Sequence, residues 1–159
     1  MSLPPIGTLL PHSAPMLLLD RLLRVDGDFL CAEVRIGAAS LFCDGSGVGA
    51  WIGIEYMAQA IAAYAGYGAH VRGEAAKPGF LLGTRHFEAL RPLFPVGSVL
   101  HVHVHRVAQG GNGLAAFECR IDDMSALPAV TVATATVTVF EPDNVNDFLH
   151  GSLDGRGNE

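Results

Sequence analysis

The chain has 159 residues, of which 50% are hydrophobic and 16% are charged, with a formal net charge of −6 and a pI near 5.5. This length predicts one domain that buries roughly two thirds of the surface exposed by the unfolded chain. The acidic balance argues against nucleic-acid binding, and no basic cluster indicates an anionic membrane surface. The three cysteines are far apart and form no C-x-x-C pair, so they favour a reducing cytoplasm over a disulfide framework or a zinc cluster.

The N-terminal stretch MSLPPIGTLLPHSAPMLLLDRLL is interrupted by four prolines and lacks a basic start. We therefore expect no signal peptide, and no later window is long and apolar enough to predict a membrane span. Two short apolar runs, LLLDRLLRVDG and FLCAEVRI, meet around an Asp-Gly-Asp turn and predict a hairpin. The glycines of GAASLFCDGSGVGA, which follows, allow the backbone to approach another strand or a ligand closely.

The next stretch, WIGIEYMAQAIAAYAGY, carries a single charge, the carboxylate of Glu55. No proline occurs from Ala50 to about His70, and alanine, methionine and isoleucine are frequent, which predicts a helix of about five turns. The helix is apolar on nearly every side, so we expect other parts of the protein to wrap it.

The second half of the chain has the period of β-strands. Residues 98–108 alternate, Gln109 to Gly113 has the composition of a hairpin turn, and Val130 to Phe140 is rich in valine and threonine. These patterns predict several antiparallel strands around the helix. We expect a single domain over residues 1–142 and a poorly ordered C-terminal tail over residues 143–159.

Three separated motifs resemble the beta-hydroxyacyl-ACP dehydratases of type II fatty acid synthesis. LLPHSAPMLLLDRLL is similar to their opening box, GIEYMAQA to their helix motif, and FLLGTRHFEALRPLFPVGSVL to their strand segment, in family order. The resemblance implies the hotdog fold, an α+β architecture in which a curved antiparallel sheet of five to six strands wraps a long central helix. The opening box and the helix are closer still to a divergent predicted dehydratase branch of aryl polyene biosynthesis.

The chain departs from this pattern at one important position. The fatty acid enzymes carry a catalytic histidine in an HFPG box fourteen residues before the helix glutamate, and the corresponding residue here is Leu41, within SLFCDGSGVGAW. A different residue must therefore supply the base, or the chain has lost the activity.

The resemblance implies dehydration of a 3-hydroxyacyl thioester on acyl carrier protein to the trans-2-enoyl thioester. Such a reaction needs a base, an acid and donors that stabilise the thioester oxygen. Glu55 matches the family's glutamate, and desolvation in an apolar helix suits a carboxyl group to act as a general acid. The alternatives are a buried acid paired with an arginine, or a solvent-facing acid at the start of the helix.

His12 is our candidate for the base, because it matches the histidine of the opening box. The alternative is a structural histidine that holds the opening segment in place. His86 is a second candidate, although an outward-facing strand histidine explains it better. Cys43 and Asp44 lie in the loop that replaces the HFPG box and have only this position to favour them.

Backbone amides that follow the glycine-rich loop are candidate donors for a thioester oxygen. A flexible surface loop is the alternative explanation of these glycines. Gln59 lies four residues after Glu55 on the same helical face, so it is placed to orient Glu55 or the substrate, unless it is an ordinary polar residue of a dimer contact. The predicted substrate-binding residues are Gly47, Gly49, Ala50, Trp51 and Gln59.

His101, His103 and His105 alternate along one strand and so share one face. Same-face neighbours lie nearly 7 Å apart, so a single zinc ion would not easily reach all three. We predict no metal site and a solvated or partner-facing stripe of histidines.

The expected partners are acyl carrier protein and a second hotdog subunit, either an identical copy or a related dehydratase, with an acyl tunnel between the subunits. The phosphopantetheine arm of the carrier brings the substrate, so we expect no other cofactor. Two further functions remain open from the sequence: a non-catalytic hotdog subunit that stabilises a partner dehydratase, and an acyl thioesterase.

Overall fold

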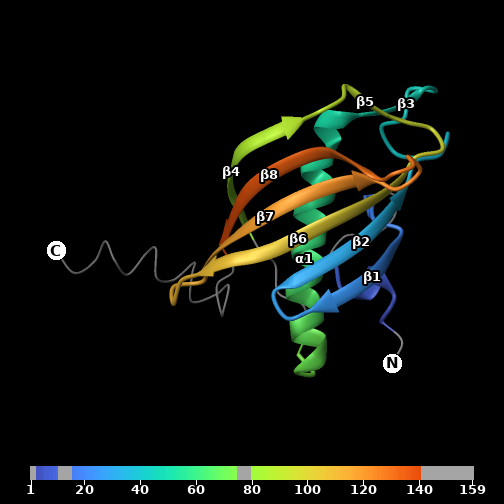
Figure 1. Cartoon of the computed structure of the whole chain (residues 1–159). Helices are drawn as coiled ribbons and strands as arrows, with labels where there is room; N and C mark the ends of the chain where they lie inside the picture. Colours follow the sequence, from blue (N-terminus) through green and yellow to red (C-terminus); the bar gives the residue numbers. More distant parts are fainter. Residues whose placement is uncertain (1–2, 11–15, 75–79, 141–159) are drawn as a thin grey trace.

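Most of the protein consists of a curved six-stranded antiparallel sheet with one long helix on one of its faces (Figure 1). The computed structural model describes residues 3–10, 16–74 and 80–140. Its elements are η1 (Ile6–Thr8), β1 (Arg21–Asp26), β2 (Phe29–Arg35), β3 (Gly47–Gly49), η2 (Ala50–Ile52), α1 (Gly53–Val71), β4 (Phe80–Ala89), β5 (Leu93–Pro95), β6 (Val99–Gln109), β7 (Leu114–Asp123) and β8 (Val130–Phe140).

The strand order in the sheet is β1-β2-β6-β7-β8-β4, and every neighbouring pair is antiparallel. The predicted hairpin between β1 and β2 and the strand over Val130–Phe140 are confirmed, and β6 begins one residue later than predicted. The sequence did not predict the short ribbon in which β3 pairs with β5 beside the sheet.

The core lies between α1 and the sheet face that curves around it (Figure 1). Along β6, Leu100, Val102 and Val104 are fully buried on the helix side, which leaves the alternating histidines on the opposite face. On the helix, Met57 and Ala60 are also fully buried. The predicted helix is thus confirmed, and its wrapping by protein explains its apolar character.

A 3-10 turn precedes α1, and Gly73 follows its end at Val71. Gly73 has a φ of +71°, and its amide donates to the carbonyl of His70, while the amide of Glu74 donates to the carbonyl of Ala69. This pair of bonds is the Schellman arrangement, which satisfies the last carbonyls of a helix.

In the part of the chain that the structure describes, no helix is long and apolar enough to span a membrane.

Candidate functional site

Glu55 lies near the start of α1, one helical turn after Trp51. It is half-buried, and its Oε1 accepts a hydrogen bond of 3.2 Å from Nε2 of Gln59. Among the residues that the structure describes, Gln59 is its one hydrogen-bond partner, and no arginine or lysine pairs with it. Glu55 is therefore an acid near the core that has a neutral neighbour and no counter-ion within the described chain.

Gln59 is fully buried and makes three hydrogen bonds. Its Nε2 donates to the carbonyl of Met16 at 2.7 Å as well as to Glu55, and its Oε1 accepts from the amide of Leu18 at 2.9 Å. Both N–H bonds of the amide are thus used within the chain. This geometry favours the predicted orienting role of Gln59 and leaves no donor for a substrate.

Besides its contact with Gln59, the chain before α1 also packs against the helix where Leu9 meets Gly66. A Cβ atom at Gly66 would lie 2.0 Å from the carbonyl oxygen of Leu9, so only glycine allows the backbone this close. Ile6, Leu9 and Leu10 are buried in the same region. The predicted base, His12, lies outside the described residues, and its role stays a prediction.

The described histidines do not contact Glu55. His70 lies at the far end of α1, roughly 22 Å along the helix axis from Glu55 at 1.5 Å per residue. His86 is exposed on β4, with a φ of +57° at a bulge in the pairing with β8. The three histidines of β6 lie on the sheet face that turns away from the helix. No described histidine is therefore a better candidate for the base than His12.

The glycine-rich loop contacts the protein itself at two of its predicted binding positions. A Cβ atom at Gly47 would lie 2.2 Å from the carbonyl oxygen of Phe94, because β3 and β5 run against each other. The amide of Ala50 donates to the carbonyl of Pro92 at 3.0 Å. The close backbone approach predicted from the glycines is thus an approach to another strand, and the Ala50 amide already has an acceptor.

Trp51 and Gly49 remain open as substrate-binding residues. The Trp51 side chain is 67% exposed and lies beside Gly49, and its ring is 6.3 Å from that of Phe42, which is also exposed. Trp51 is one turn before the candidate acid, and with the Phe42 ring beside it offers an apolar surface at the start of the helix. Asp44, in contrast, accepts hydrogen bonds from Ser46 and from the Gly47 amide, so it shapes the loop.

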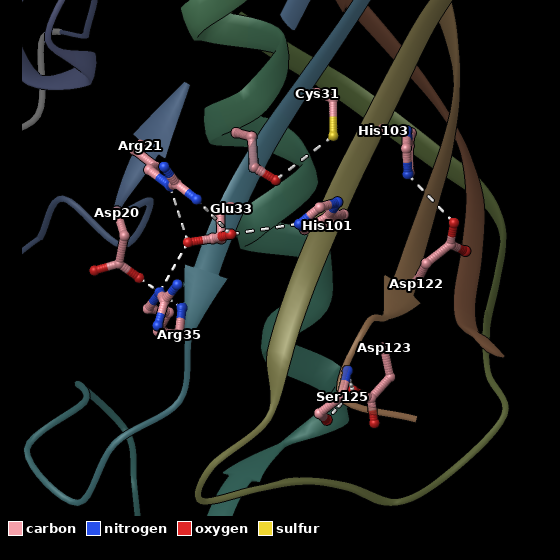
Figure 2. Close-up of polar contacts among 11 residues, drawn as sticks. Asp20, Arg21, Cys31, Glu33, Arg35, His101, His103, Asp122, Asp123 and Ser125 are labelled. Atoms are coloured by element: carbon pink, nitrogen blue, oxygen red, sulfur yellow. Dashed lines mark hydrogen bonds and ion pairs between the residues drawn. The ribbon is translucent and has the colours of Figure 1, made fainter. Parts of the chain in front are cut away.

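Charged side chains on the outer face of the sheet form a network that the sequence did not predict (Figure 2). Glu33 on β2 is only 3% exposed, and Arg21, Arg35 and His101 converge on its carboxylate at 3.0, 2.8 and 3.4 Å. Its hydrogen bond with Arg21 is the main reason why the pKa of Glu33 falls to about 2. Nothing in the sequence pattern distinguishes this buried acid from an exposed one, because β2 is apolar on both sides of it.

His103 lies in the same face beside Asp122, with Nε2 at 3.2 Å from Oδ2 (Figure 2). Burial lowers the pKa of His103 to about 4, and this effect outweighs the attraction of Asp122. The ring is therefore neutral at pH 7, with Nε2 facing the carboxylate and Nδ1 without a hydrogen-bond partner among the described residues. The predicted stripe of His101, His103 and His105 is therefore less solvated at His103 than we expected.

Among the described residues, no group of three histidine, cysteine or acidic side chains could hold a metal ion.

Comparison with known proteins identifies one family and several solved structures that share this architecture. The model of the ApeP-like family, described as ApeP dehydratase, matches residues 4–150. None of the curated proteins matches the chain. A chain of the dehydratase heterocomplex ApeI:P from Xenorhabdus doucetiae is 28% identical, with a TM-score of 0.81, and the match covers 94% of this chain and 97% of that one.

More distant structures share the fold alone. Thioesterase superfamily member 2 from zebra fish is 11% identical over 83% of this chain and 87% of that chain, with a TM-score of 0.63. AziG from S. sahachiroi is 14% identical over 77% and 90%, with a TM-score of 0.58. Together with the helix and the strand order described above, these structures confirm the predicted hotdog fold.

Proposed function

Because the chain belongs to the ApeP-like dehydratase family, as its resemblance to the aryl polyene branch predicted, we propose that it dehydrates a 3-hydroxyacyl thioester on acyl carrier protein. The product is the trans-2-enoyl thioester. The observation that carries this proposal is the position of Glu55: a half-buried acid on the apolar central helix, with a neutral amide as its one described partner. A carboxyl group that no cation pairs is free to donate and accept a proton.

In the proposed reaction His12 removes the proton from Cα of the substrate, and the electrons of that bond form the double bond between Cα and Cβ. The C–O bond at Cβ breaks, and the hydroxyl group takes a proton from Glu55 and leaves as water. An amide at the start of the helix stabilises the negative charge on the thioester oxygen, and this amide is not that of Ala50, which donates to Pro92. The substrate is held on the phosphopantetheine arm of the carrier, and the reaction needs no other cofactor.

The direct test supplies a 3-hydroxyacyl carrier protein to the purified full-length chain, alone and together with a related hotdog dehydratase. Mass spectrometry of the carrier distinguishes loss of water from hydrolysis, which would release the free thiol and support a thioesterase instead. We expect enoyl product from the wild-type chain and a large loss with Glu55→Ala. Equal product from both proteins would contradict the proposal.

A second candidate is a non-catalytic subunit that stabilises a partner dehydratase. Two observations favour it: the HFPG histidine is absent, and the similar Xenorhabdus structure is a dehydratase heterocomplex. This candidate predicts a stable heterodimer whose activity survives Glu55→Ala in this chain. Co-expression with the partner, followed by the same assay, separates the two functions. For either function we propose the cytoplasm, because the three cysteines are free thiols.

A further inference from the structure

Phe42 has a backbone conformation that a bulky residue rarely adopts. Its φ is +69°, and it is the third residue of a turn that the Cys43 amide closes by donating to the carbonyl of Ser40 at 3.0 Å. A positive φ at this position of a turn favours glycine or asparagine, because the Cβ atom of other residues crowds the backbone. Phe42 therefore holds a strained conformation at a place where glycine would fit without strain.

Packing in the core does not compensate for this strain. The side chain of Phe42 is 48% exposed and lies outside the core cluster. Its one ring contact in the described chain is with Trp51, at 6.3 Å between the ring centres and with a tilt of 55°. Backbone strain of this kind is concentrated at functional sites. The exposed ring of Phe42 thus points to contact with a ligand and not to a role in stability.

Trp51 presents a flat apolar face and an unused donor beside this ring. Its side chain is 67% exposed, and the indole lies over the backbone of Gly49, where a Cβ atom would clash with Nε1. Among the residues that the structure describes, Nε1 has no hydrogen-bond acceptor. An exposed indole with an unused N–H suits a ligand that combines apolar groups with an acceptor oxygen.

The side of the helix that carries Glu55 leads from solvent into the core. Trp51, Glu55 and Gln59 follow each other at four-residue spacing, and their side chains are exposed, half-buried and fully buried in that order. A carrier protein is too large to enter the core, so its thioester has to approach Glu55 from the exposed end. Trp51 lies about 6 Å before Glu55 along the helix axis. The aromatic pair of Phe42 and Trp51 is therefore beside the path of the arm that joins the thioester to its carrier.

We propose that Phe42 and Trp51 clamp the pantetheine arm of the substrate. The two rings pack against its methyl and methylene groups, and Nε1 of Trp51 donates to one of its amide carbonyls. This inference rests on the proposed function and adds to it two residues that recognise the arm of the carrier and not the acyl group. It also explains the strain at Phe42, because the turn holds the ring beside Trp51.

The chain contains a single tryptophan, so fluorescence reports the clamp directly. Titration of the full-length protein with pantetheine, which is the arm without an acyl group or a carrier, should shift the emission of Trp51. In Phe42→Gly the Kd for pantetheine should rise about tenfold, whereas Phe42→Tyr keeps an aromatic ring and should bind within about twofold of wild type. Val71→Ala is the matched control and should bind like wild type, because it removes an exposed apolar side chain at the other end of the same helix.

Stability and kinetics separate this role from a structural one. Glycine relieves the strain, so the melting temperature of Phe42→Gly should stay the same or rise by up to about 4 °C while pantetheine binding weakens. His86→Gly replaces the other non-glycine residue with a positive φ in the described chain, and it should give a similar change in melting temperature with unchanged pantetheine binding. Phe42→Gly should lower kcat/KM about tenfold for a 3-hydroxyacyl pantetheine thioester, but less than about threefold for the ethyl thioester of the same acid, which lacks the amides of the arm.

Three results would overturn the proposal. The first is an emission of Trp51 that does not respond to pantetheine but changes when a second hotdog subunit is added, which would assign the aromatic pair to a subunit interface. The second is a Kd of Phe42→Gly within twofold of wild type, and the third is an equal loss of kcat/KM for both thioesters together with a lower melting temperature. Failure of the proposed function has a different signature: the wild-type chain then forms no enoyl product from either thioester, although the pantetheine titration still distinguishes it from Phe42→Gly.

Discussion

Two glutamates lie close to the core of this protein, and their surroundings differ. Glu33 on β2 is 3% exposed, and two arginines and a histidine contact its carboxylate. Glu55 on α1 is half-buried, and its one described partner is the neutral amide of Gln59. A carboxylate that is removed from water needs compensation from cations or hydrogen bonds, and among the residues described by the structure cations contact Glu33 but not Glu55.

This difference separates an acid that ion pairs hold in place from the acid that we propose to be reactive. Arg21 and Arg35 hold Glu33 in its charged form, so it cannot exchange a proton near neutral pH. In the described chain, Glu55 is oriented by Gln59 and has no arginine or lysine partner, a setting that suits a carboxyl group to proton transfer. The comparison predicts that loss of Glu55 affects turnover and that loss of Glu33 affects folding.

The largest expected effect is that of Glu55→Gln. Removing the proton donor should lower kcat for enoyl formation by about 10²- to 10⁴-fold, the usual contribution of general acid catalysis. The melting temperature should stay within about 2 °C, because the half-buried side chain keeps its shape and loses no ion pair with the described part of the chain. Steady-state kinetics and a thermal melt of the same preparation measure both quantities. A normal rate with a lower melting temperature would reverse the roles of the two acids.

The opposite pattern is expected for Glu33→Gln. The substitution keeps the size of the side chain but removes its charged hydrogen bonds with Arg21 and Arg35, which should lower the free energy of unfolding by about 2 to 3 kcal/mol. Urea unfolding measures this loss, and turnover per folded molecule should not change. The matched control is Arg120→Gln on the same face: its bond with Asp122 is exposed, so the expected change is below about 1 kcal/mol.

Much of the helix side could be predicted from sequence, because local patterns determine it. The proline-free, alanine-rich stretch after Ala50 predicted α1, and its apolar character predicted that the rest of the protein wraps it. The alternation of residues 98–108 placed the three histidines on one strand face correctly. Each of these conclusions depends on residues that are close together in the chain.

The contacts that the sequence did not predict join residues that are far apart. Glu33 on β2 contacts His101 on the neighbouring strand β6. Gln59 makes hydrogen bonds to the backbone of Met16 and Leu18, more than forty residues earlier in the chain. A backbone carbonyl or amide that accepts or donates such a bond leaves no mark in residue identity. For the same reason Gly66, a residue type that is unfavourable inside a helix, is explained only by the Leu9 backbone that lies against it.

A pair of glycine substitutions tests the helix side further. Gly66→Ala places a Cβ atom against the Leu9 backbone and should destabilise the protein by about 1 to 3 kcal/mol, the usual cost of overpacking. At Gly68 the nearest atom to a new Cβ is a flexible arginine nitrogen at 3.3 Å. Gly68→Ala should therefore be neutral or stabilise the helix by up to about 1 kcal/mol. Urea unfolding of both variants measures the difference, and equal effects would show that Leu9 does not pack as described.

At pH 7 the smallest expected effect is that of His103, which adds a pH dependence on the sheet side. Its pKa falls from 6.5 to about 4 through burial, so the unfolded chain binds a proton that the folded chain does not. This contribution to stability is fully present above pH 6.5 and is lost as the pH falls toward 4. The pKa of Glu33 falls from 4.5 to about 2, so its contribution is present above pH 4.5 and is lost only in stronger acid.

The two pH windows can therefore be measured separately. His103→Gln should flatten the decline in unfolding free energy between pH 6.5 and 4 by up to about 3 kcal/mol, whereas Glu33→Gln should leave this range nearly parallel to wild type and flatten the decline below pH 4.5. Urea unfolding at a series of pH values gives both slopes. An unchanged slope in His103→Gln would mean that the folded protein does not lower the pKa of His103, and that Asp122 offsets the effect of burial.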